Sequence, residues 1–191
     1  MNKMEYQNPM IEVADRELHE ECGVFGVYGV ENASSLAYYG LHSLQHRGQE
    51  GCGMVSVDSE NRMHRHRGHG LVQEVFNEGQ LSKLEGNMCL GHVLYTTAGG
   101  RSIDNIEPLS FLHNTGSFAI AHNGNIVNAQ QIRDYLESKG SLFQSHTNAE
   151  LLAHLIKKEA DEPRIFTIME ALDLLEGSFA FVIMTQNRLY A

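Results

Sequence analysis

Short apolar runs, separated by glycine or polar residues, recur along the chain. Each run has the length of a β-strand and is apolar at most positions, a pattern typical of strands that are covered on both faces. The runs occupy residues 23–28, 53–58, 89–95, 117–122 and 178–185. Strands of this kind need a further layer on each side, so the pattern predicts sheets that are covered by helices.

Amphipathic segments between these runs are the predicted helices, and their ends carry capping signals. One helix follows residue 33, a second is capped by Asn128, and a third is capped by Thr147 with Glu150 three residues later. A fourth begins at Pro163 and ends at Gly177. The order of elements predicts a single α+β domain with helices outside two packed sheets.

The final stretch, "FAFVIMTQNRLYA", predicts a strand, a turn at Gln186 and Asn187, and the start of a return strand. The return strand has only four residues. We therefore expect the sequence to be a fragment of a longer protein, truncated at the C-terminal end of its fold.

Length and charge exclude several classes of function. The chain has 191 residues, of which 42% are hydrophobic, and this is enough to bury one core. Its formal net charge of −10 disfavours binding to nucleic acid or to an anionic membrane surface. The N-terminal residues lack the apolar core of a signal peptide, and no run is long enough to span a bilayer. These features predict a cytoplasmic protein.

Neither the cysteines nor the clustered histidines show a metal-binding pattern. The three cysteines are scattered and give neither a disulfide framework nor a zinc site: Cys22, Cys52 and Cys89. Three histidines have a spacing that could chelate a metal, but no carboxylate or thiol partner is apparent: His64, His66 and His69. We interpret the histidine segment as a solvated strand and turn, and we expect no metal in this domain.

Cys22 lies at the start of a predicted strand, in the stretch "LHEECGVFGVYG". A thiol reacts as the thiolate and has an ordinary pKa of ~8.5, so it needs a nearby base or positive charge. Glu20 and Glu21 carry negative charges, which disfavour the thiolate. Removal of residues 1–21 would turn the Cys22 nitrogen into an α-amine with a pKa of ~8, beside its own thiol. The alternative is that Cys22 is a small buried apolar residue.

Several motifs resemble those of one enzyme family, in order from Glu20 to the last residue. They are "EECGVFGVYG", "YYGLHSLQHRGQEGCGM", "GLVQEVF", "GHVLYTTAGG", "AHNGNIVNAQQ" and "AELLAHLIK". Together they are similar to the glutaminase domain of the glutamine phosphoribosylpyrophosphate amidotransferases, or amidophosphoribosyltransferases. The resemblance implies a four-layer αββα sandwich of the N-terminal-nucleophile (Ntn) hydrolase type. It also implies a leader at residues 1–21 and an incomplete glutamine amidotransferase type 2 domain at residues 22–191.

The resemblance implies roles for particular residues. Cys22 would be the nucleophile, its freed α-amine the base, and the Asn123 side chain with the Gly124 backbone N–H the oxyanion hole. Further residues would lie beside the nucleophile or wall the substrate site: Arg47, Gly48, Tyr95 and Thr97. From the residues alone, "HNGN" is also explained by a tight turn after a buried strand, with Gly124 at positive φ.

Two positions depart from the family pattern. Leu94, in "GHVLY", replaces the arginine that holds the glutamine α-carboxylate in relatives, and Asn148 replaces the aspartate that holds the α-ammonium. Each charge-assisted hydrogen bond contributes ~1.5–3 kcal/mol, so their loss could weaken glutamine binding by roughly two to four decades. Arg101 could reach the site instead, although an exposed loop arginine is the simpler interpretation.

Three functions are compatible with the sequence. The first is a glutaminase that passes ammonia to a phosphoribosyltransferase domain missing from this sequence, for phosphoribosylamine formation in purine synthesis. The second is a degenerate, non-catalytic module that has lost glutamine binding, as Leu94 and Asn148 suggest. The third is a related hydrolase whose substrate lacks an α-carboxylate. The first implies glutamine as substrate, no cofactor in this domain and a homo-oligomer at full length.

Overall fold

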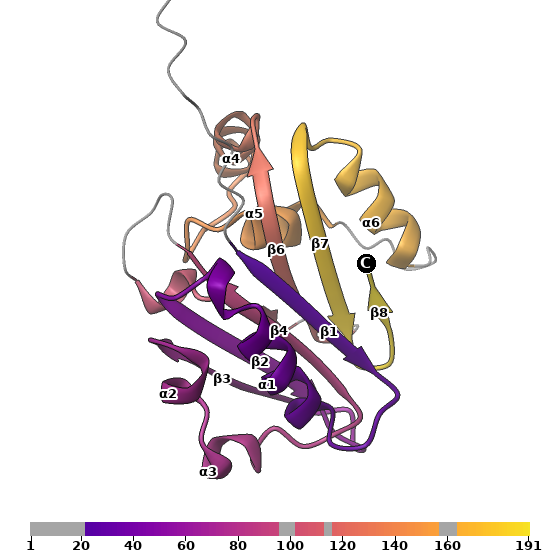
Figure 1. Ribbon diagram of the computed structural model, residues 1–191. Helices are drawn as coiled ribbons and strands as arrows, with labels where there is room; N and C mark the ends of the chain where they lie inside the picture. Colours follow the sequence, from indigo (N-terminus) through magenta and orange to yellow (C-terminus); the bar gives the residue numbers. More distant parts are fainter. Residues whose placement is uncertain (1–21, 96–101, 113–115, 157–163) are drawn as a thin grey trace, which may run out of the picture.

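Two four-stranded antiparallel sheets form the centre of the computed structural model, which describes residues 22–95, 102–112, 116–156 and 164–191 (Figure 1). The strand orders are β1-β4-β2-β3 and β5-β6-β7-β8. The first sheet contains β1 (Gly23–Tyr28), β2 (Gly51–Val57), β3 (Met63–His69) and β4 (Met88–Leu94). The second contains β5 (Leu109–Phe111), β6 (Phe118–Ile126), β7 (Gly177–Thr185) and β8 (Leu189–Tyr190).

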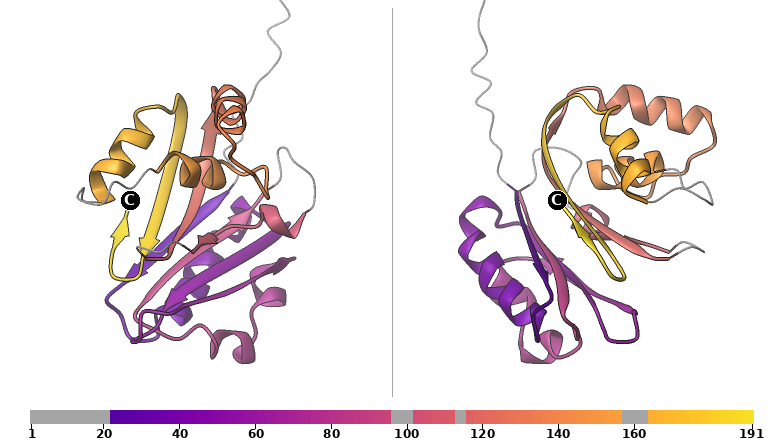
Figure 2. Two further views of the ribbon diagram at one scale, coloured as in Figure 1. Left: turned by 180° about the vertical axis from the view of Figure 1, so that it is seen from behind. Right: turned by 90° about the vertical axis from the view of Figure 1, so that its right-hand side faces the viewer.

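Helices cover the outer face of each sheet. The first sheet carries α1 (Ala33–Ser43) and α2 (Val72–Val75), followed by α3 (Glu78–Leu81). On the second sheet, α5 (Asn148–Leu155) packs against β5 and β6, and α4 (Ala129–Ser138) and α6 (Arg164–Leu172) pack against α5. The side view in Figure 2 shows the succession of helix, sheet, sheet and helix. The predicted α+β sandwich of four layers is confirmed.

Three apolar clusters hold these layers together, one between each pair of neighbouring layers. The cluster between the two sheets consists of Val55, Val57, Met88 and Leu90 from the first sheet and Ala119, Ala121 and Met184 from the second. The small alanines of β6 allow the two sheets to approach closely. Residues on this inner face of either sheet are therefore brought near the other sheet.

The strands predicted from the apolar runs are all present; β1 matches its predicted bounds, and the other four have shifted ends. The largest shift is in β6, which continues to Ile126 although the predicted run ended at residue 122. The continuation was not predicted, because the polar residues Asn123 and Asn125 interrupt the apolar run that indicates the strand. The three-residue strand β5 was not predicted, and the return strand β8 is confirmed.

The helix ends differ from the predictions in two places. The last helix was predicted to end at Gly177, but α6 ends at Leu172, and Gly177 begins β7. Its predicted start, Pro163, lies outside the described residues. Asn128 precedes α4 as expected, yet its side chain does not cap that helix. It donates to the carbonyl of Leu174 at 3.0 Å and accepts from the amide of Glu176 at 3.0 Å, which fixes the turn before β7.

The capping signal at Thr147 is confirmed in part. Its hydroxyl oxygen accepts a hydrogen bond from the Glu150 amide at 3.2 Å, as an N-cap residue does. The Glu150 carboxylate, however, does not reach back to Thr147. It accepts from the amides of Gln144 and Ser145 at 2.8 and 2.6 Å, and so fixes the loop before the helix.

The histidine segment forms β3, an edge strand, as the sequence predicted. His64 Nε2 lies 2.8 Å from the buried carboxylate of Asp58, and His66 Nε2 lies 3.1 Å from the carbonyl oxygen of Val75. Within the described parts of the chain, no group of histidine, cysteine, aspartate and glutamate side chains is arranged to hold a metal ion. In the same parts, every helix is too short or too polar to cross a membrane.

Candidate active site

Cys22 lies directly before β1, at one end of the space between the two sheets. Side chains alternate between faces along a strand, so Cys22 shares its face with Val24, which packs against the apolar cluster between the sheets. Its thiol sulfur lies 3.6 Å from the carbonyl oxygen of Tyr95. The side chain is half-buried. The predicted nucleophile is thus at the mouth of the inter-sheet space, not within the core.

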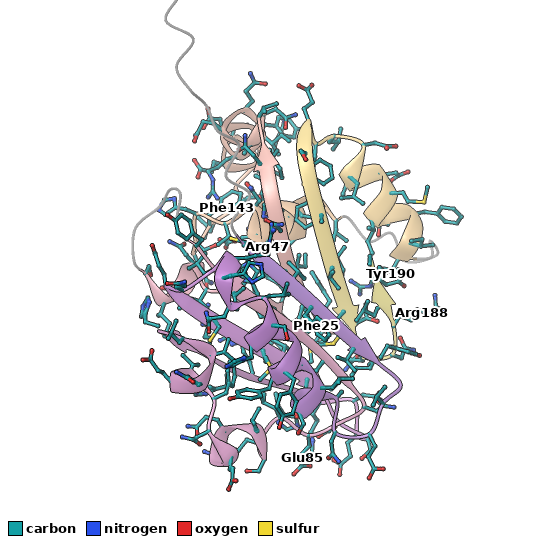
Figure 3. All side chains as sticks on the ribbon, viewed as in Figure 1. Phe25, Arg47, Glu85, Phe143, Arg188 and Tyr190 are labelled. Carbon is teal, nitrogen blue, oxygen red and sulfur yellow. The ribbon has the colours of Figure 1, made fainter. Side chains whose placement is uncertain are left out.

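Arg47 and Gly48 hold this end of β1 in place. Arg47, in the short helix η1 (Gln45–Arg47) after α1, donates from Nε to the carbonyl oxygen of Cys22 at 2.9 Å. Figure 3 shows Arg47 beside the start of β1. A Cβ on Gly48 would lie 2.8 Å from the backbone carbonyl carbon of Leu94, so only glycine fits there. Arg47 therefore contacts Cys22, as predicted, and Gly48 packs against the end of the neighbouring strand β4.

A cavity of about 250 Å³ opens beside Cys22, and we call it the Cys22 cavity. It brings together most of the predicted site residues: Cys22, Leu94, Tyr95, Gly124 and Asn148. It is also lined by polar residues that were not predicted as site residues: His92, Asn105, Glu107, His122, Asn125, His146 and Thr147. Thr97 lies outside the described residues. The elements that meet here are β1, β4, β6 and the N-terminal end of α5.

Asn123 is not among the lining residues of the cavity, although its neighbour Gly124 is. It is half-buried. Asn123 is two and four residues from Ala121 and Ala119, whose side chains pack between the sheets. Alternation along β6 therefore directs the Asn123 side chain toward the first sheet, to which Cys22 is joined.

The Gly124 amide points toward an open edge of β6. Strand β5 pairs with β6 only as far as Ile120, so among the described residues no strand pairs with this edge at residues 122–126. The His122 amide donates to a side chain on that edge instead of to β7. Amide groups alternate between the two edges of a strand, which places the Gly124 amide on the same open edge. An amide in this position can donate to a ligand in the cavity.

The backbone at Gly124 has a φ of +123°, as predicted, but the predicted turn is wrong, because "HNGN" lies within β6 and pairs with β7. A Cβ at this position would lie 2.2 Å from the Ser178 carbonyl oxygen and 2.6 Å from the Phe179 Cα atom, both in β7. Glycine is therefore required for two reasons, the positive φ and the close approach of a neighbouring strand.

We expect Gly124→Ala to lower the free energy of unfolding by about 3 kcal/mol or more, because it combines backbone strain with a clash in the sheet. Gly140→Ala is the matched control. Gly140 also has positive φ, +92°, but nothing lies within 4 Å of its Cβ position, so we expect a loss of about 1–2 kcal/mol. Denaturant unfolding measures both. Equal losses of unfolding free energy in the two variants would show that the close approach of β7 does not add to the destabilisation by Gly124→Ala.

The inner end of the cavity is formed by buried titratable groups. Glu107 and His92 are 3% and 1% exposed, and the Glu107 carboxylate accepts a hydrogen bond from the His122 amide at 2.6 Å. Burial raises the pKa of Glu107 to about 8. Burial, together with the neighbouring His122, lowers the pKa of His92 to about 3. Although His92 Nε2 lies 3.8 Å from Glu107, the two form no ion pair near neutral pH, because both favour the uncharged form.

The cavity has no strong charge of its own where a free amino acid would need one. Its described lining contains no arginine, lysine or aspartate. Leu94 and Asn148, the two positions at which the sequence resemblance implies departures from the family pattern, are both in that lining. The structure therefore places both residues at the candidate site.

The other two thiols lie in the buried core. Cys52 and Cys89 are fully buried, and burial raises the pKa of each to about 12. Both remain protonated at neutral pH and have no route to solvent. The expectation that they are buried thiols is confirmed.

Comparison with known proteins identifies several relatives. Residues 101–191 match a family described as "Glutamine amidotransferase domain". Amidophosphoribosyltransferase of Bacillus subtilis is 51% identical over 173 residues, which are 90% of this chain and 36% of that protein. Amidophosphoribosyltransferase of Lacticaseibacillus casei is 50% identical over 175 residues, 91% of this chain and 90% of that sequence.

Solved structures share the fold. Glutamine phosphoribosylpyrophosphate amidotransferase from B. subtilis, complexed with ADP and GMP, superimposes with a TM-score of 0.80 and 47% identity. A structure described as the allosteric regulatory enzyme of purine biosynthesis has a TM-score of 0.82 and 50% identity. In both cases the match covers 87% of this chain and 36% of the other. The chain thus spans about a third of these solved chains.

Proposed function

Because this chain belongs to the amidophosphoribosyltransferase family, we propose that it hydrolyses glutamine to glutamate and ammonia at Cys22. The observation that carries the proposal is that Cys22, Gly124 and Asn148, far apart in the sequence, line one cavity. In the proposal, residues 1–21 are a leader that is removed, and residues 22–191 are the glutamine amidotransferase domain. The mature chain therefore begins with the nucleophile.

The proposed reaction uses groups of this chain and water. The freed α-amine of Cys22 takes the thiol proton, and the sulfur attacks the carboxamide carbon of glutamine. The negative charge that develops on the carboxamide oxygen is stabilised by the Asn123 side chain and the Gly124 amide, each contributing ~3–4 kcal/mol. The amine returns its proton to the leaving nitrogen, ammonia departs and a thioester remains. Water then attacks the thioester and releases glutamate and the thiol.

The remaining parts of the proposal concern the longer protein. Ammonia would pass to a phosphoribosyltransferase domain outside these 191 residues and form phosphoribosylamine for purine synthesis. The enzyme would act in the cytoplasm as a homo-oligomer, with no cofactor or metal in this domain. The family membership supports the transferase assignment, since relatives of about three times the matched length carry the name amidophosphoribosyltransferase.

A second candidate function rests on Leu94 and Asn148. Because the described lining of the Cys22 cavity has no arginine, lysine or aspartate, the domain could keep the fold while no longer binding glutamine. It would then be a structural module beside a partner that uses free ammonia. This candidate predicts no glutamate release by any form of the chain.

Glutamate release distinguishes the two candidates. The chain that begins at Cys22 should release glutamate from glutamine, whereas the 191-residue chain with residues 1–21 attached should not, because an amide nitrogen cannot act as the base. Asn123→Ala in the processed chain should lower kcat by about 100- to 1,000-fold, as expected for loss of one oxyanion donor. Equal activity with and without the leader would contradict the proposed base.

A further inference from the structure

One buried carboxylate connects the two chain segments that flank the Cys22 cavity. The Glu107 carboxylate accepts a hydrogen bond from the His122 amide of β6 at 2.6 Å. The Ala149 amide and the Thr147 hydroxyl, at the N-terminal end of α5, also interact with this carboxylate and favour its ionised form. Asn123 and Gly124 directly follow the first donor, and Asn148 lies between the other two. Glu107 thus contacts both segments while facing the same cavity.

The position of Glu107 follows from the strand register. Leu109 pairs with Ile120, so residue 107 stands opposite His122, two residues beyond the last paired residues of β5 and β6. No backbone carbonyl of β5 serves the His122 amide there, and the Glu107 side chain takes that place. A Cβ on Gly53 of β2 would lie 2.5 Å from the Glu107 carbonyl oxygen, so the backbone at residue 107 is also held firmly.

The groups around Glu107 do not supply a neutralising charge. His92 from β4 and His122 from β6 both have pKa values lowered by burial, to about 3 and about 4. His146, before α5, lines the same cavity. Arg67 of β3 donates to the carbonyl oxygen of Ile106 at 3.1 Å and pairs with Asp104, not with Glu107.

We propose that Glu107 is a positioning residue for glutamine hydrolysis, whose ionised carboxylate ties the strand segment bearing Asn123 and Gly124 to the helix end bearing Asn148. The inference rests on the proposed function, because it assigns Glu107 to the support of that reaction. A carboxylate offers acceptor sites on both oxygens, enough for all three donors. A protonated carboxyl turns one oxygen into a donor, so one of the three donors loses a good acceptor.

The proposal therefore predicts a pH dependence whose sign is fixed. The pKa of Glu107 is raised to about 8, so the carboxyl is mostly neutral at pH 6.5 and ionised at pH 9. Ionisation strengthens the hydrogen bonds from both segments, so the ionised carboxylate holds the two segments together as the pH rises through about 8. Because the folded-state pKa is raised by burial, the same buried charge lowers the overall free energy of unfolding as the pH rises toward about 8. Glu107→Gln keeps the shape of the neutral form and removes the titration.

The test compares alkylation of Cys22 by a glutamine-mimicking diazoketone in the processed wild type and in Glu107→Gln. The ratio of the wild-type to the variant second-order rate constant should rise from about one at pH 6.5 to about ten at pH 9. This is the effect expected when one buried donor in the variant has no good acceptor. The α-amine of Cys22 titrates equally in both proteins and cancels in the ratio. Alkylation by iodoacetamide, which needs no oxyanion hole, should be the same in both.

Glu150→Gln is the matched control. Glu150 is also buried and accepts three hydrogen bonds near the start of α5, but its partners are Gln144 and Ser145, and it does not line the Cys22 cavity. The ratio of wild type to this variant should stay constant between pH 6.5 and 9. A ratio for Glu107→Gln that is also constant would overturn the positioning role.

A second measurement does not depend on glutamine chemistry. In ¹H–¹⁵N NMR spectra of the 191-residue chain, the His122 and Ala149 amides should shift with one shared midpoint near pH 8, and Glu107→Gln should remove it. Separate midpoints, or a midpoint that survives the substitution, would overturn the inference. The two amides could share a midpoint while the diazoketone fails to label the wild-type protein. That result would support the connection through Glu107 and would contradict only the proposed function.

Discussion

Cys22→Ala will lower glutamate release from glutamine by at least about four orders of magnitude, because the substitution removes the proposed nucleophile that forms the thioester. The loss should appear in kcat, and the melting temperature should change little, since the Cys22 side chain is half-buried at the mouth of the cavity. A coupled glutamate assay on the processed chain measures the effect.

Cys52→Ala is the control for this prediction. Its thiol is fully buried, with a pKa raised to about 12, so its removal should leave the glutaminase rate within about two-fold. Comparable losses in the Cys22 and Cys52 variants would mean that the activity is lost through misfolding or arises from another group.

The double substitution Leu94→Arg with Asn148→Asp should increase kcat/KM for glutamine by roughly two to four decades. Each change restores one charge-assisted hydrogen bond to the free amino acid, worth ~1.5–3 kcal/mol, at a position that lines the Cys22 cavity. The gain should appear mainly as a lower KM, because the α-carboxylate and α-ammonium are bound equally in the ground and transition states.

The single variants serve as controls for the pair. Each should give part of the gain, and a simple amide without α-substituents should be hydrolysed no faster by the double variant than by the wild type. If the correctly processed double variant shows no gain with glutamine, the assignment of these two positions to the substrate site is wrong.

Much of the fold follows from local patterns in the sequence. The apolar runs correctly predicted the central strands, because strands covered on both faces are continuously apolar. The same rule failed in β6, where Asn123 and Asn125 interrupt the pattern within a single strand. That failure falls at the candidate site, where these two polar residues lie on a strand without being part of its buried core.

The site itself was predictable only in part. Cys22, Leu94, Gly124 and Asn148 were found through motifs, and the structure places them around one cavity. Glu107 was missed because its donors lie 15 or more residues away and meet it only through the register of β5 and β6. Its one sequence signal is an acidic residue directly before the apolar strand "PLSF".

Capping signals show why local sequence rules are insufficient to predict helix ends and turns. Asn128 has the right position to cap α4, but tertiary partners at Leu174 and Glu176 take both ends of its amide. The last helix was predicted to continue to Gly177, yet α6 ends at Leu172, and Leu175 is buried from the turn that leads into β7. In both cases the connection to β7, which the sequence pattern does not show, determines the outcome.

The central claim is that a liberated amino terminus and its own thiol form the reacting pair. Mass spectrometry of the purified protein, before and after treatment with a glutamine-mimicking electrophile, tests this most directly. We predict a mature chain that has lost residues 1–21 and gains one adduct, located on the sulfur of an N-terminal Cys22. A chain that keeps its first 21 residues and takes up no label would contradict the account.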